Sequence, residues 1–147
     1  MTEVAFHFNA PDRLGYACRL LRKAYLKGAR LQVLADPPLA AALDQQLWLL
    51  AGVEFVPHCR SDAPAPLQAR SPIVISSHLA DTSGDDQVLV NLSDELPEGF
   101  QRFARVIEVV TADPPARARA RDRWKQYKAA GHEPQHLDLS ALHPSRN

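Results

Sequence analysis

Closely spaced glycines are missing from this chain of 147 residues, and their absence excludes the common phosphate-binding loops. The six glycines never lie within ten residues of one another, and none of them is followed by lysine. A loop that cradles phosphates needs several glycines close together, because the backbone must approach the phosphates closely. The sequence therefore contains neither a Walker A loop nor a dinucleotide-binding fingerprint.

Cysteine and net charge are also scarce. Cys18 and Cys59 are the only two cysteines and form no CxxC pair. This excludes a disulfide scaffold and a zinc ribbon, and it indicates a reducing cytoplasm. Seventeen lysines and arginines balance seventeen aspartates and glutamates. A nonspecific DNA coat would carry a uniform basic excess, so any anion-binding surface here must be local.

Long apolar runs are absent as well. No segment approaches the roughly 20 apolar residues that span a bilayer. The first ten residues, MTEVAFHFNA, have neither the basic start nor the apolar run of a signal peptide. We therefore expect a cytoplasmic protein that does not contact the membrane.

Short apolar runs do alternate with segments of helical periodicity along the chain. We predict strands at residues 4–9, 31–35, 73–76, 87–92 and 105–110, and helices at 11–27, 36–50 and 114–131. This order is typical of βαβ crossovers. It predicts a single three-layer α/β domain over residues 1–131, with a mostly parallel sheet, Rossmann-like but without a phosphate-binding loop. Residues 132–147 show no periodicity, and we expect an irregular tail.

The last of these helices carries a concentrated basic segment at residues 116–131, ARARARDRWKQYKAAG. Asp113 and Pro114 mark the start of this helix, and Gly131 marks its end. The spacing i, i+4, i+7, i+11 places Arg117, Arg121, Trp124 and Lys128 on one face. We expect Ala116, Ala120 and Tyr127 to face the core, and Arg119, Arg123 and Gln126 to face water. Cations around an indole suit a ligand that combines an aromatic group with carboxylates or phosphates.

The second predicted helix has a similar start, because Ala-Asp-Pro-Pro follows a strand at both places. A tryptophan follows Asp36 after twelve residues and Asp113 after eleven. On a helical wheel, Leu39, Leu43, Leu47 and Leu50 form the buried stripe. Trp48 lies near the polar side, so we expect it to be exposed and to contact a partner.

Signals for catalysis are weak. Ser76, Ser77 and His78 are consecutive, and His58 adjoins Cys59. Side chains that are adjacent on a strand point apart, and there is no GxSxG motif. A small hydrolase or transferase that uses His58 or His78 is therefore the least favoured alternative.

Two further histidines, His132 and His136, have the spacing of a helical metal pair. Pro134 lies between them and breaks the helix that such a pair requires. We therefore predict neither a metal nor a cofactor.

Two segments of the chain, residues 44–58 (DQQLWLLAGVEFVPH) and residues 120–132 (ARDRWKQYKAAGH), resemble blocks of the chi subunit family of bacterial DNA polymerase III. The resemblance extends over most of the chain. It implies a noncatalytic replication subunit that binds the acidic C-terminal tail of single-stranded DNA-binding protein, which ends in an aromatic residue. The residues carried over to this peptide pocket are Trp48, Val110, Arg117, Arg121, Trp124, Lys125 and Lys128, with Gly131 nearby.

The resemblance also assigns roles and a second partner. Arg121 would bind the terminal carboxylate of the tail, and Arg117 and Lys125 would attract upstream acidic side chains. The psi subunit, which links chi to the clamp loader, would contact Phe55, Val56 and Pro57, although Phe55 also fits ordinary core packing. DNA would then be contacted only indirectly.

Direct binding of single-stranded nucleic acid is the main alternative. In this hypothesis Trp48 and Trp124 stack on bases while the arginines follow the phosphates. The zero net charge argues against it.

Overall fold

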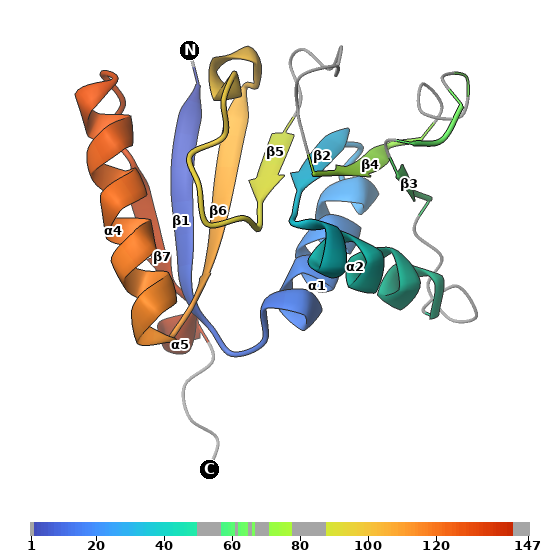
Figure 1. Cartoon of the computed structure of the whole chain (residues 1–147), viewed down its shortest axis with the longest axis horizontal. Coiled ribbons are helices and arrows are strands. Elements are labelled where there is room, and N and C mark those ends of the chain that lie inside the picture. Colours follow the sequence, from blue (N-terminus) through green and yellow to red (C-terminus); the bar gives the residue numbers. More distant parts are fainter. Residues whose placement is uncertain are drawn as a thin grey trace.

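The computed structural model describes residues 2–49, 57–60, 62–64, 66, 71–77 and 88–142 (Figure 1). In this part of the chain one sheet of seven parallel strands has the order β3-β4-β2-β5-β6-β1-β7. The strands are β1 (Glu3–Ala10), β2 (Leu31–Leu34), β3 (Cys59–Arg60), β4 (Ile73–Ser76), β5 (Val88–Asn91), β6 (Arg105–Thr111) and β7 (Gln135–Asp138). The helices are α1 (Arg13–Leu26), α2 (Pro37–Leu49), α4 (Pro114–Ala129) and α5 (Leu139–Leu142), with a 3-10 turn at Phe100–Arg102.

Helices cover both faces of the sheet and make three layers. Successive side chains of a strand point to opposite faces. Accordingly Ile107 and Val109 of β6 pack in one apolar cluster with α1 and α2, whereas Val106 and Val110 pack in another with α4. Figure 1 shows α4 on one side of the molecule and α1 and α2 together on the other. None of the helices in the described ranges is long and apolar enough to cross a membrane.

The predicted α/β architecture is confirmed, with the predicted strands and helices displaced by at most two residues at their ends. The end of α4 is also as predicted, since the helix stops at Ala129 and Gly131 has a φ of +95°. A left-handed φ of this kind is favourable for glycine and terminates helices.

The prediction of an irregular segment after residue 131 is wrong for residues 135–142. Gln135–Asp138 forms β7, which pairs in parallel with β1, and Asn9 Nδ2 donates a hydrogen bond of 2.9 Å to Asp138 Oδ1. The strand is short and polar, so no hydrophobic alternation marks it. Only its pairing with β1 defines it as a strand.

Candidate functional site

A pocket of about 170 Å³ opens between α4 and the strands β1, β6 and β7. Its lining consists of Phe6, Phe8, Val110, Arg117, Ala120, Arg121, Trp124 and His136. Phe6, Val110 and Ala120 are buried, whereas Arg117 and Arg121 are exposed. The pocket therefore combines an apolar interior with two cations that water can reach.

Aromatic rings form most of the apolar wall of this pocket. The ring centroid of Trp124 lies 5.1 Å from that of Phe6 and 6.0 Å from that of His136. His136 in turn lies 5.6 Å from Phe8. Tilted rings at such distances attract one another and also offer faces to an added ring. The wall is therefore suited to an aromatic ligand group.

Four of the predicted pocket residues meet here: Val110, Arg117, Arg121 and Trp124. Lys125 and Lys128 are exposed on α4 but do not line the pocket. Gly131 lines a different pocket of about 220 Å³, at the other end of α4. The residues at the i, i+4 and i+7 positions, Arg117, Arg121 and Trp124, thus line one pocket, and Lys125 and Lys128 lie further along the helix.

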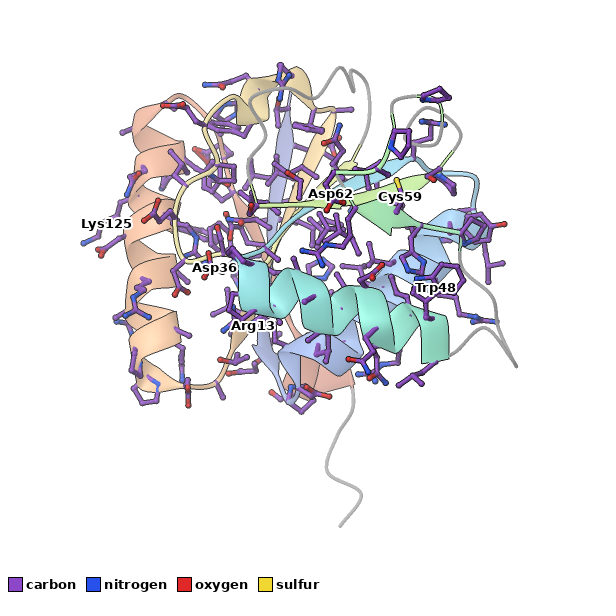
Figure 2. The ribbon with its side chains drawn as sticks, turned by 45° about the vertical axis from the view of Figure 1, so that its right-hand side comes forward. Arg13, Asp36, Trp48, Cys59, Asp62 and Lys125 are labelled. Atoms are coloured by element: carbon purple, nitrogen blue, oxygen red, sulfur yellow. The ribbon has the colours of Figure 1, made fainter. Side chains whose placement is uncertain are left out.

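The expectation that Trp48 shares this pocket with Trp124 is wrong. Trp48 lies near the end of α2, whose buried residues belong to the apolar cluster on the opposite face of the sheet from α4. Figure 2 shows Trp48 on one side of the molecule and Lys125, the neighbour of Trp124, on the other. The exposure of Trp48 is nevertheless as predicted, at 54%.

Trp48 lies instead beside His58, which directly follows the predicted psi-contact residues 55–57 in the sequence. Its ring centroid is 5.1 Å from that of His58, and His58 Nε2 lies 3.1 Å from Asp44 Oδ1 of α2. Pro57 is half-buried next to His58. Phe55 and Val56 lie outside the described residues. The structure therefore groups Trp48 with His58 rather than with the pocket.

A buried polar cluster lies on the sheet side of α4. Arg123, predicted to face water, is only 3% exposed. Its Nε donates to Glu108 Oε1 at 3.0 Å, and Tyr127 Oη donates to Glu108 Oε2 at 2.7 Å. Asn91 Nδ2 lies at 3.0 and 2.9 Å from the two Glu108 oxygens and donates to that carboxylate. We call these four residues the Glu108 cluster.

The electrostatics of the Glu108 cluster follow from its burial. Burial raises the pKa of Glu108, and this effect is opposed by Arg123 and by hydrogen bonds from Asn91 and Tyr127. Burial, together with the Glu108 carboxylate, also raises the pKa of Tyr127, so its hydroxyl remains a donor. A lone acidic residue within the apolar run VIEVV was the available sequence signal for this cluster.

Sequence reasoning also missed Phe6, Phe8 and His136 as lining residues. The alternation in VAFHF signals that Phe6 and Phe8 share a face. No comparable signal exists for His136, because β7 was not predicted. His132 lies apart from it, with its ring 5.2 Å from that of Phe100. In the described ranges, no three histidine, cysteine, aspartate or glutamate side chains lie together so that they could hold a metal ion.

The fold and the site together define a parallel α/β protein with an aromatic pocket edged by arginines. The family described as "DNA polymerase III chi subunit, HolC" matches residues 1–135. The chain belongs to this family, as its sequence blocks indicated. The members of this family are accessory subunits of the replicative DNA polymerase III.

Several relatives support this assignment. The DNA polymerase III subunit chi of Pseudomonas aeruginosa is 32% identical over 138 residues, which cover 90% of this chain and 93% of the relative. That of Haemophilus influenzae is 29% identical over 116 residues, with 78% and 79% covered. A solved structure of the C-terminal domain of the DEAD-box protein Dbp5 superposes with a TM-score of 0.57 at 13% identity, covering 95% of this chain and 91% of that domain. At this identity the last likeness concerns the fold alone.

Proposed function

We propose that the pocket beside α4 binds the acidic C-terminal tail of single-stranded DNA-binding protein, and that the protein is a noncatalytic replication adaptor. One observation carries this proposal: two exposed arginines, Arg117 and Arg121, edge a pocket whose other lining is apolar and aromatic. A peptide that ends in an aromatic residue and a carboxylate presents both complementary groups.

The size of the pocket fits the terminal ring of such a peptide. Its volume is about 170 Å³, and an apolar cavity of about 150 Å³ holds a benzene molecule. With the ring packed against the aromatic wall of the pocket, Arg121 at its edge binds the terminal carboxylate. Arg117 then attracts upstream acidic side chains, and Lys125 and Lys128 extend the positive charge along α4.

Titration of a tail peptide, labelled at its amino end and followed by fluorescence anisotropy, tests the proposal. Loss of a charge-assisted contact costs about 1.5–3 kcal/mol, so Arg121→Ala is expected to weaken binding about 10- to 100-fold. Arg119→Ala is the matched control, because Arg119 is an exposed arginine of the same helix outside the pocket and lies 3.4 Å from Asp94. Absence of saturable binding at low salt, or equal losses in the two variants, contradicts the proposal.

Peptide variants and an oligonucleotide identify which ligand groups matter. Amidation of the peptide's carboxyl end is expected to mimic Arg121→Ala, and replacement of its terminal ring by alanine to mimic loss of Trp124. A labelled single-stranded oligonucleotide tests the alternative function. If it binds saturably without a partner protein and Trp124→Ala abolishes this binding, the pocket is a nucleic-acid site instead.

We also propose that a second surface around Trp48 contacts the psi subunit and so links the protein to the clamp loader. The large apolar side chains of Trp48 and Leu49 are 54% and 67% exposed, and Trp48 lies beside His58, which follows the predicted contact residues 55–57. An exposed tryptophan beside another apolar side chain is typical of a protein-binding surface. Co-sedimentation with purified psi tests this: Trp48→Ala is expected to abolish the complex and to spare tail binding, and Arg121→Ala to do the reverse.

A further inference from the structure

A buried ion pair helps to hold α4 on the sheet, in addition to its apolar contacts. Within the Glu108 cluster, each oxygen of the Glu108 carboxylate accepts from a different donor on α4: Oε1 from Arg123 and Oε2 from Tyr127. Arg123 also donates from Nη1 to the carbonyl of Asp94 at 2.9 Å. The cluster therefore joins α4 to β6, to Asn91 of β5 and to the loop that follows β5.

These bonds are directional, whereas apolar packing is not. Arg123 and Tyr127 are four residues apart and lie on the same side of α4. Rotation of the helix by one residue, about 100°, would remove both donors from the carboxylate. The cluster thus selects one rotation of α4 about its own axis.

That rotation decides the shape of the neighbouring pocket. Arg121 lies two residues before the cluster residue Arg123 and Trp124 lies one residue after it, and both line the pocket. The ring of Tyr127 lies 5.8 Å from that of Phe6, which in turn lies 5.1 Å from Trp124. The buried cluster and the pocket therefore adjoin through Phe6.

We propose that Glu108 and Arg123 are positioning residues for the peptide pocket: their buried ion pair sets the rotation of α4 and thereby holds Arg121 and Trp124 opposite the phenylalanines of β1. This inference rests on the proposed function of the pocket. The cluster touches no ligand itself.

A purely stabilising role makes a different prediction from a positioning role. Removal of one partner of a buried ion pair is destabilising, whereas replacement of the whole pair by apolar side chains is often neutral or stabilising. If the cluster served stability alone, an apolar replacement that keeps the protein folded would keep its ligand affinity. If it positions α4, the same replacement weakens binding.

The decisive variant is the triple substitution Glu108→Leu/Arg123→Met/Tyr127→Phe. It removes one negative and one positive charge, so the net charge is unchanged, and Asn91 keeps its hydrogen bond to the Glu95 carbonyl. Tail affinity, thermal midpoint and Trp124 fluorescence are measured, the last in a Trp48→Phe background so that Trp124 is the only tryptophan. We expect a midpoint near that of the parent, at least fivefold weaker tail binding and a shifted emission maximum.

Arg119→Met is the control, since it removes a cation from the same helix without touching the cluster, and we expect neither the emission nor the affinity to change by more than about twofold. A folded triple variant with parental affinity and emission overturns the proposal. If the triple variant does not fold, Tyr127→Phe and Glu108→Gln take its place, and unchanged affinity and emission in both overturn it. If the parent protein binds no tail peptide, the proposed function fails, whereas the emission of Trp124 still decides whether the cluster positions α4.

Discussion

The two tryptophans, Trp48 and Trp124, lie on helices that begin alike, but their surroundings differ. Both helices begin with Pro-Pro directly after an aspartate. In both of them the residue eleven positions after the aspartate packs toward the sheet. That position is Leu47 in α2, which is buried, and Trp124 in α4, which packs against Phe6. The twelfth position is exposed in both, as Trp48 and Lys125. One residue of spacing, a rotation of about 100°, therefore separates a pocket tryptophan from a surface tryptophan.

The two helices also cover different faces of the sheet. Both faces of a parallel sheet are apolar, so the strand sequences do not show which helix covers which face. α2 joins the cluster that contains Ile107, and α4 joins the one that contains Val106. Similar local motifs can therefore lie on two separate surfaces of one protein.

The largest expected effect separates two neighbouring residues of α2. Leu47 is fully buried, so Leu47→Ala is expected to lower the free energy of unfolding by about 2–5 kcal/mol through loss of packing and formation of a cavity. Trp48→Ala is expected to change it by less than about 1 kcal/mol, since most of that side chain is exposed. Urea denaturation measures both. Comparable losses would show that Trp48 is part of the core.

The next effect distinguishes the two tryptophans by ligand. Trp124→Ala is expected to weaken tail binding at least 30-fold, because buried aromatic anchors contribute about 2 kcal/mol or more. Trp48→Ala is expected to leave tail binding unchanged. Anisotropy titrations measure the affinities, and thermal melts verify that both variants are folded. Equal weakening would mean that the two tryptophans share one site after all.

A buried histidine, His7, lies on the face of the sheet opposite α4. Its lowered pKa predicts that the stability of the protein depends on pH. His7 Nδ1 lies 2.6 Å from Tyr16 Oη. Burial, with smaller contributions from Arg105 and Lys23, lowers the pKa of His7 from 6.5 to about 4. Between these two pKa values the unfolded chain binds a proton at His7 that the folded protein does not bind. The contribution of His7 to the free energy of unfolding is therefore fully present above pH 6.5, and it is lost as the pH decreases toward 4. We expect His7 to account for about 1–3 kcal/mol of this decrease.

Comparison of the wild-type protein with His7→Gln, unfolded in urea at several pH values, measures this contribution. The carboxylates titrate alike in both proteins, so they cancel in the difference. A difference in unfolding free energy that stays constant between pH 7 and pH 4 would contradict the lowered pKa.

The smallest effect compares the two surfaces by their salt dependence. The proposed tail pocket is edged by the exposed Arg117 and Arg121. Tail binding is therefore expected to weaken about tenfold between low and high salt, because salt screens exposed charges. Binding of psi at the apolar surface around Trp48 is expected to change little, since apolar contacts carry no charge. Titrations at several salt concentrations measure both. A salt-insensitive tail affinity would point to ring packing alone.

Much of the fold was predictable because periodicity is a local property. Three features follow from neighbouring residues: the alternation of strands and helices, the end of α4 just before Gly131, and the shared face of Arg117, Arg121 and Trp124. The inward direction of Arg123 did not follow, because its partner Glu108 lies on another element. β7 and its residue His136 were not predicted, because a short polar strand has no hydrophobic alternation and is defined only by its pairing with β1.

The sequence by itself determined the class of fold, the absence of a phosphate-binding loop, the cationic face of α4 and the exposure of Trp48. These depend on spacing within one helix, strand or loop, where geometry is periodic. Only the tertiary structure decided that the two tryptophans belong to separate surfaces and that β1 supplies the pocket's phenylalanines. The physical reason is that these choices depend on crossover direction and on contacts between residues distant in the chain, which local periodicity does not record.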